Sequence, residues 1–156
     1  MTYEEALHKA AAYCSQAEHC TFEVKEKLSR WEIAPNDQKT IIHHLEKENF
    51  LSNNRYALAF VKDKFRYNKW GKIRIQLELQ RRQIDKETIS EALESLEEDA
   101  YLNLAVDLAQ SKLRGLKYKD IYERDGKLFR YMAGKGFESG IIREALKILS
   151  SGKEDA

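Results

Sequence analysis

The chain has 156 residues, of which 42% are apolar and 34% are charged, with one proline and seven glycines. This length suits one domain or a short array of small units, and so few turn-forming residues argue against all-β and α/β folds. Glu, Lys, Leu, Ala and Arg dominate the composition, and because these residues favour helices we predict an all-α protein.

No stretch of the sequence approaches the roughly 18 consecutive apolar residues that a membrane span needs. The first residues, Met1–Glu5, are acidic and lack the basic and then apolar layout of a signal peptide. We therefore predict a cytoplasmic protein that does not associate with membranes. In such a reducing compartment the two cysteines, Cys14 and Cys20, are expected to be free thiols.

Helical spacing of apolar residues predicts nine helices, in chain order over residues 2–15, 21–32, 36–48, 52–68, 71–82, 85–96, 98–113, 117–134 and 138–150. Local signals support several helix starts. Thr2 with Glu5 is typical of a capping box, Asp85 is a good N-cap, and Pro35 suits a first helical turn.

A pattern of apolar and acidic residues repeats along the chain, with an offset of 49 and then 48 residues between its first two copies. The three copies are Val24, Leu28, Asp37, Ile41 and Leu45; Ile73, Leu77, Asp85, Ile89 and Leu93; and Leu128, Met132, Glu138, Ile142 and Leu146. The repeat predicts three three-helix units over residues 1–50, 51–97 and 98–150, followed by a disordered tail over 151–156. Units this small have little core of their own, so we expect them to stack into an elongated, curved array.

The fifth predicted helix carries apolar residues on two opposite faces. Ile73 and Leu77 share one face, and Ile75 and Leu79 share the other. The pattern predicts that this helix is covered twice, by its own unit and by something else.

The sequence contains few residues that could carry out catalysis. Cys14, His19 and Cys20 lie close together, but their spacing matches no zinc-binding motif, so we predict no bound metal. No phosphate-binding GxxxxGK[ST] loop occurs, and no nucleophile, base and orienting group are evident together. We therefore predict no cofactor, no catalytic residues and no enzymatic activity.

Charge is distributed unevenly, although the net charge is only +1. Residues 55–82 hold nine basic and two acidic groups, whereas residues 83–99 hold one basic and seven acidic groups. Cations beside aromatic rings could contact phosphates and bases, or an acidic protein surface, or could form an ordinary solvated face. The candidate partner-binding or DNA-binding residues are Arg55, Lys62, Arg66, Lys69, Trp70, Lys72, Arg74, Arg81 and Arg82. A competing basic set in the third unit comprises Lys117, Lys119, Arg124, Lys127 and Arg130.

Four segments together resemble the central signature of the RecX family. They are Leu51–Val61, the stretch from Trp70-Gly71-Lys72 to Leu79, Ile84-Asp85, and Glu91-Ala92-Leu93. About 45 residues carry this match, and the three-unit organisation extends it over nearly the whole chain. Ser52 and Asn53 replace the family's usual acidic cap. Gln83 stands where the family usually has glycine, which leaves the form of that turn open.

The resemblance implies a small helical modulator of the RecA recombinase. It implies binding in the groove of the RecA–DNA filament and modulation, most simply inhibition, of ATP hydrolysis, strand exchange and filament growth. The same resemblance connects the chain with homologous recombination, DNA repair and the SOS response, and we expect a monomer. Two other functions stay open, namely a helical module that binds DNA directly without RecA and a helical adaptor for a different protein.

Overall fold

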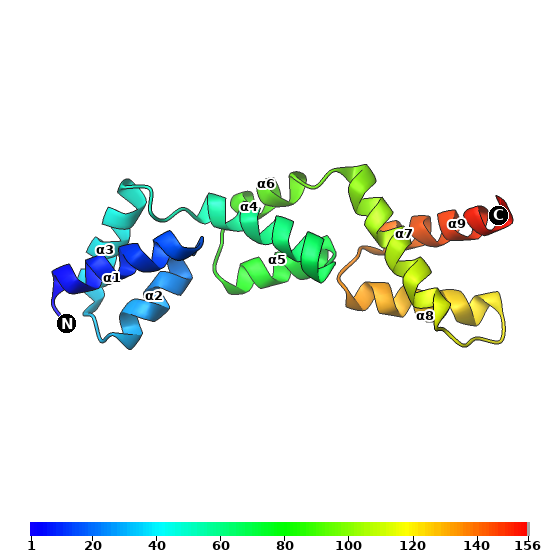
Figure 1. The fold of residues 1–156 in the computed structure, drawn as a ribbon, viewed down its shortest axis with the longest axis horizontal. Coiled ribbons are helices and arrows are strands. Elements are labelled where there is room, and N and C mark those ends of the chain that lie inside the picture. Colours follow the sequence, from blue (N-terminus) through cyan, green and yellow to red (C-terminus); the bar gives the residue numbers. More distant parts are fainter. Residues whose placement is uncertain (156) are drawn as a thin grey trace. The chain divides into compact units, whose positions relative to one another are not determined.

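The computed structural model of the chain describes the backbone of residues 1–155 and the side chains of residues 1–152. Over these residues it consists of α-helices and one π-helical turn, without β-strands, which confirms the all-α prediction (Figure 1). The helices are α1 (Tyr3–Gln16), α2 (Thr21–Arg30), α3 (Pro35–Lys47), α4 (Asn53–Asp63), the π-helical turn η1 (Lys64–Asn68), α5 (Lys72–Arg81), α6 (Lys86–Glu94), α7 (Glu98–Arg114), α8 (Ile121–Gly134) and α9 (Ser139–Asp155).

The predicted start signals cap helices as expected. The Thr2 hydroxyl accepts a hydrogen bond from the Glu5 N–H at 3.1 Å, and the Asp85 carboxylate accepts one from the Thr88 N–H at 2.8 Å. Pro35 opens α3. The Thr2 and Asp85 side chains satisfy N–H groups that have no partner within their own helix.

Helices α8 and α9 each have one end that differs from the prediction by more than two residues. Helix α8 begins at Ile121 rather than at residue 117, because the Asp120 carboxylate accepts from the Glu123 N–H and so sets the start of the helix. Helix α9 continues to Asp155, five residues past the predicted end, since no proline interrupts its last turns. Ala156, the last residue of the predicted tail, lies outside the described residues.

The chain divides into two compact units. Unit 1 comprises Met1–Phe60 and Glu78–Ala92, and unit 2 comprises Val61–Leu77 and Leu93–Ala156. The boundary passes through α4, α5 and α6, so the helices of the predicted middle unit contribute to both compact units. The predicted elongated and curved shape stays a prediction.

In unit 1, the helices α1, α2 and α3 contact one another around a shared apolar core (Figure 1). Its buried residues are Ala6, Ala10, Cys14, Val24, Leu28, Ile41, Ile42, Leu45 and Leu51. In unit 2, helix α7 contacts both α8 and α9, which also contact each other. Buried residues of these three helices include Tyr101, Ala105, Ala109, Leu128, Met132, Ile142 and Ala145.

The repeat is present, but its register in α5 differs from the predicted one. Ile75 and Leu79 are fully buried, whereas Ile73 and Leu77 are 46% and 49% exposed. Burial therefore aligns Leu28 with Leu79 and Met132, at offsets of 51 and 53 residues, and the predicted pairing of Leu28 with Leu77 is wrong. Both apolar pairs of α5 have helical spacing, so the pattern alone cannot tell which pair faces the core.

The same turn closes the second helix of each repeat. Ile33, Ile84 and Phe137 donate their N–H groups five residues back, to the carbonyls of Leu28, Leu79 and Met132. The residue before each donor lies in the left-handed region, with φ of 59° at Glu32, 58° at Gln83 and 97° at Gly136. These are Schellman turns. The turn at Gln83 therefore has the same form as the turn at Gly136, although it contains no glycine.

Gln83→Gly is expected to stabilise the protein by about 0.5–1 kcal/mol, because glycine removes the steric cost of the left-handed conformation. The greater backbone entropy that glycine gives the unfolded chain offsets only part of this gain. Gln80→Gly is the matched control, since Gln80 is exposed within α5 and glycine should destabilise that helix by about 1 kcal/mol. Urea denaturation followed by circular dichroism measures both. Destabilisation by both changes would contradict the expectation.

Both thiols are buried and are expected to react slowly with thiol reagents in the native protein. Burial, followed by the nearby Glu18 carboxylate, raises the pKa of Cys14 to about 11, and burial likewise raises the pKa of Cys20 to about 11. Little reactive thiolate is then present at neutral pH. Labelling with a chromogenic disulfide at pH 7.5 should accelerate strongly in denaturant. Rapid labelling of the native protein would show that these sites open readily.

Candidate partner-binding surface

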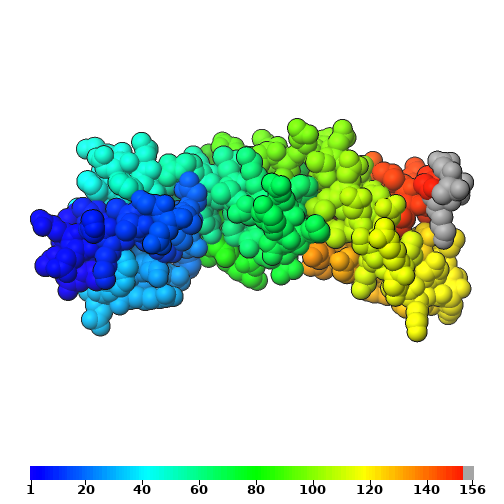
Figure 2. All heavy atoms as spheres, viewed as in Figure 1, coloured from blue at the N-terminus to red at the C-terminus, as the bar shows by residue number. Residues whose placement is uncertain are grey.

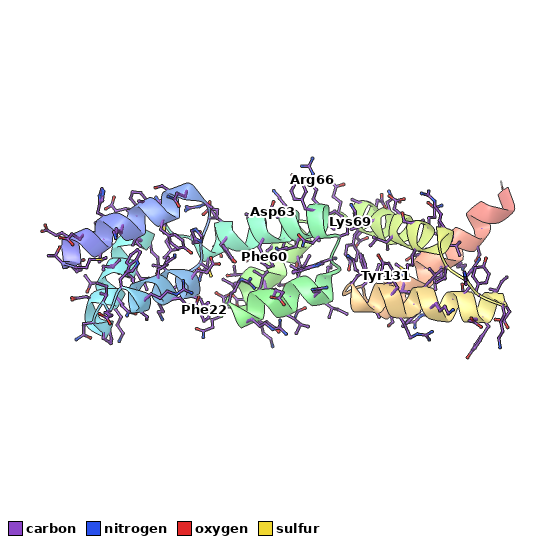
Figure 3. All side chains as sticks on the ribbon, turned by 60° about the horizontal axis from the view of Figure 1, so that its bottom comes forward. Phe22, Phe60, Asp63, Arg66, Lys69 and Tyr131 are labelled. Atoms are coloured by element: carbon purple, nitrogen blue, oxygen red, sulfur yellow. The ribbon has the colours of Figure 1, made fainter. Side chains whose placement is uncertain are left out.

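A π-helical turn displays part of the basic segment. Helix α4 passes directly into η1, which ends where Lys69 adopts a left-handed conformation with φ of 56°. The Trp70 N–H donates to the Lys64 carbonyl at 3.1 Å, six residues back, which closes the widened turn. Tyr67 is 70% exposed in this turn. Arg66 and Lys69 lie at the same end of α4, where Arg66 projects away from the ribbon (Figure 3).

Two cations lie close to the indole of Trp70. Lys64 Nζ is 5.1 Å from the centre of the indole and the Arg74 guanidinium is 4.2 Å from it, both within the range of cation–π attraction. In the same turn, the Asn68 carbonyl accepts a hydrogen bond from Lys135 Nζ at 3.1 Å. We call this set the Trp70 cluster, and it consists of Lys62, Lys64, Arg66, Lys69, Trp70, Lys72, Arg74 and Lys135.

The start of α5 is fixed by the turn between α8 and α9. The Gly71 N–H donates to the Lys135 carbonyl at 2.8 Å, and the Ile73 N–H donates to the Gly136 carbonyl at 3.0 Å. A Cβ on Gly71 would lie 2.3 Å from the Gly136 backbone, and a Cβ on Gly136 would lie 2.4 Å from Arg74 Cβ. Only glycine at both positions permits this approach, and it holds Arg74 beside Trp70.

A buried tyrosine completes the attachment of α5. The Tyr101 hydroxyl accepts from the Lys72 N–H at 2.9 Å and donates to the Glu138 carboxylate. Burial, followed by the hydrogen bond to Glu138, raises the pKa of Tyr101. Lys72 Nζ also lies 4.8 Å above the Tyr101 ring. The N-terminal amides of α5 are therefore bonded to the turn between α8 and α9 and to Tyr101 of α7, and these bonds fix the start of α5 beneath the Trp70 cluster.

The structure separates the nine predicted binding residues into two groups. Six of them, Lys62, Arg66, Lys69, Trp70, Lys72 and Arg74, belong to unit 2 and to the Trp70 cluster. The other three belong to unit 1 and have partners there. Arg55 donates to Glu18 and to the Asn49 carbonyl, and Arg81 pairs with Glu78.

Arg82 has the most structural role of the nine. Its guanidinium donates to the carbonyl and the carboxylate of Glu78 and lies 4.9 Å from the centre of the Phe60 ring. A cation engaged in this way has less freedom to reach a partner. Two cations of the cluster, Lys64 and Lys135, were not among the predicted residues. Lys64 adjoins the predicted set in the sequence, but only the fold brings Lys135 to Asn68.

The outer face of α5 continues this surface with exposed apolar residues. In unit 2, Ile73 and Leu77 lie one helical turn apart and about half of each side chain is exposed. Their repeat equivalents are Phe22 and Glu26 in α2, and Gly126 and Arg130 in α8, so the fold itself does not require an apolar pair there. We expect such an exposed pair to contribute to a contact with another molecule.

The histidine and cysteine positions have ordinary structural surroundings. His19 is 3.1 Å from the Glu23 carboxylate, while His43 and His44 are exposed on α3. Among the described residues, no three histidine, cysteine or acidic side chains are grouped as a metal ion would require. Within the same part of the chain, no helix is long and apolar enough to cross a membrane.

Comparison with known proteins identifies the family. Residues 52–93 match the model of the second three-helix domain of RecX, and residues 98–146 match that of its third three-helix domain. The chain is 31% identical over 147 residues to the regulatory protein RecX of Clostridioides difficile, a match that covers 94% of the chain and 69% of that protein. The chain belongs to the RecX family. It is also 35% identical over 127 residues to the regulatory protein RecX of Clostridium beijerinckii, covering 80% of the chain.

Solved RecX structures share the fold. The crystal structure of RecX from Lactobacillus salivarius matches with a TM-score of 0.88 at 22% identity, covering 95% of this chain and 96% of that one. A second crystal structure of a regulatory protein RecX matches with a TM-score of 0.84 at 20% identity, covering 92% and 72%. The chain spans only 59% of the length of the C. beijerinckii relative.

Proposed function

We propose that this chain regulates RecA by binding the RecA–DNA filament through the Trp70 cluster and the adjoining face of α5. Membership of a family of regulatory proteins supports this role, as does a basic surface in which two cations, Lys64 and Arg74, lie within cation–π range of one indole. A RecA–DNA filament offers protein carboxylates and DNA phosphates, and arginine and lysine can pair with both.

The decisive observation is that the cationic surface is held in place before binding. Three amides at the start of α5 are bonded to Lys135, Tyr101 and Gly136, so Arg74 and Trp70 keep their relative positions. A pre-organised surface loses less conformational entropy on binding than a flexible one. The apolar side chains of Ile73 and Leu77 add a contact that excludes water beside the charged one.

In this proposal the chain acts by binding and carries no catalytic group. Contact with neighbouring RecA subunits would oppose the movements that accompany ATP turnover, so ATP hydrolysis, strand exchange and filament growth would all slow. Binding lowers turnover only if the chain prefers one conformation of the filament over the others.

The test measures RecA-catalysed ATP hydrolysis on single-stranded DNA while this protein is titrated to saturation. The rate is expected to fall at a near-stoichiometric or lower ratio, and the protein alone is expected to hydrolyse no ATP. Unchanged RecA turnover at saturating protein would overturn the proposal. Strand exchange under the same conditions should slow in parallel.

A further inference from the structure

A second charged surface lies on the last helices of unit 2 and shares no residue with the Trp70 cluster. An open groove of about 970 Å³ is bordered by α8, by α9 and by the loop before α8. Figure 2 shows the chain around residues 115–125 in yellow at the surface of unit 2. Side chains from both helices line the groove, among them Tyr122, Phe129, Arg130, Arg143 and Lys147.

The carboxylates of this groove already have partners. Glu123 pairs with Lys127 at 3.1 Å, and Asp125 pairs with Arg124 at 3.0 Å. Asp120 caps the start of α8 by accepting from the Glu123 N–H. A cation therefore offsets the charge of Glu123 and of Asp125, and the N-terminus of α8 offsets that of Asp120.

The cations of the groove, in contrast, have no such partners. Among the described side chains, none of the lining cations Lys119, Arg130, Arg143 and Lys147 forms an ion pair. Arg143 and Lys147 are four residues apart and so share one face of α9. The groove therefore presents an uncompensated positive charge to solvent.

Only part of the competing basic set of the sequence reaches this groove. Arg124 is 2% exposed, because Asp125 and the Ser150 hydroxyl hold its guanidinium at 3.0 Å each beneath the surface. Lys127 is engaged by Glu123 and by the Lys117 carbonyl. The accessible cations are Arg143 and Lys147 of α9, Arg130 of α8, and Lys119 in the loop before α8.

A glycine inside α8 keeps the groove open. Gly126 lies within the helix, where glycine destabilises by about 0.5–1 kcal/mol relative to alanine. An ideal Cβ there would lie 3.5 Å from Nη1 of Arg130, so the guanidinium lies close to the bare backbone. The absence of a side chain at Gly126 leaves room for a ligand beside Arg130.

The first turn of α8 carries two large exposed side chains, and one of them, Tyr122, lines the groove. Tyr122 is 90% exposed and Ile121 is 63% exposed, although both lie in the first turn of α8. The Tyr122 ring therefore contributes little to the core. An exposed aromatic ring beside cations is the arrangement with which proteins stack a base and bind the phosphates on either side of it.

We propose that this groove binds single-stranded nucleic acid, with phosphates on Lys119, Arg130, Arg143 and Lys147 and a base stacked on Tyr122. This activity goes beyond the proposed regulation of RecA, because it requires neither RecA nor the Trp70 cluster. An acidic peptide could pair with the same cations but would gain little from the exposed ring. The groove is open to solvent, so a strand could reach its lining side chains.

The experiment measures the fluorescence anisotropy of a labelled 20-mer of thymidylate as the full-length chain is added, without RecA, at 50 and 200 mM salt. Arg143→Glu/Lys147→Glu is expected to weaken binding at least about tenfold, and to reduce the slope of log K against log salt by about 1.4. The matched control is Lys39→Glu/Lys47→Glu on α3, which changes the net charge equally and should shift the affinity less than about twofold.

A second pair of variants tests the stacked base. Tyr122→Ala is expected to weaken binding about fivefold or more, whereas Tyr122→Phe keeps the ring and the affinity. Circular dichroism verifies that each variant keeps its helix content. Three results would overturn the proposal. The first is equal binding by the wild type and by Arg143→Glu/Lys147→Glu. The second is loss of binding in Arg66→Glu/Lys69→Glu alone. The third is competition by polyglutamate for the same site combined with unchanged binding by Tyr122→Ala.

Discussion

Gly71→Ala is expected to lower the free energy of unfolding by at least about 3 kcal/mol, which for a chain of this size lowers Tm by roughly 6–12 °C. The added Cβ would lie 2.3 Å from the carbonyl carbon and oxygen of Gly136 and 2.4 Å from the amide nitrogen of Phe137. All three are backbone atoms, so no side chain can rotate to relieve the clash. Separating the two segments would break the bonds from Gly71 and Ile73 and weaken the one from Lys72 to Tyr101.

Gly134→Ala is the matched control for this prediction. Gly134 ends α8 in the same region, and a Cβ there would meet no atom within 4 Å. Alanine is therefore expected to leave the stability unchanged or to raise it by up to about 1 kcal/mol. Urea denaturation followed by far-ultraviolet circular dichroism compares the two variants. Equal stability of Gly71→Ala and Gly134→Ala would show that the contact with Gly136 does not form in solution.

Arg66→Glu/Lys69→Glu is expected to weaken binding to the RecA filament at least about tenfold, because even one charged contact is typically worth about 1.5–3 kcal/mol. Both side chains are exposed at the end of α4, so the reversal should leave the helix content unchanged. The concentration that half-inhibits RecA ATP hydrolysis, measured at two salt concentrations, reports the loss. Its dependence on salt should also decrease, since two cationic contacts are removed.

Lys39→Glu/Lys47→Glu again serves as the control, with the same change in net charge on α3. If both double variants weaken inhibition equally, the effect comes from the net charge and the Trp70 cluster is not the contact. If wild type inhibits and Arg66→Glu/Lys69→Glu inhibits equally well, the proposed role in regulation stands but its surface is misplaced.

The helices could be predicted from the sequence because their signals are local. Thr2 and Asp85 cap helices wherever the remainder of the chain lies, and Pro35 fits a first turn for the same reason. The register of α5 could not be predicted in this way. Ile73 with Leu77 and Ile75 with Leu79 have the same spacing, and only packing decides which pair is buried.

The candidate surface was predicted in part, because charge density is visible in the sequence whereas long-range partners are not. Arg55 is engaged by Glu18, 37 residues away, and Lys135 reaches Asn68, 67 residues away. The π-helical turn at Lys64–Asn68 also changes which side chains face outward after α4. No spacing rule anticipates the contact of Gly71 with Gly136, since it depends on how two distant turns meet.

The thrice-repeated Schellman turn limits how a chain of this kind can change in length. In each repeat, two buried residues lie 17 residues apart. These pairs are Leu28 and Leu45, Leu79 and Leu96, and Met132 and Leu149. One residue inserted within such a span would rotate every later apolar side chain of that helix by about 100° away from the core. The offset from Leu79 to Met132 is 53 residues and that from Leu28 to Leu79 is 51, and the two extra residues lie outside these 17-residue spans. Duplication or deletion of a complete three-helix group is therefore the change in length that would keep every core intact.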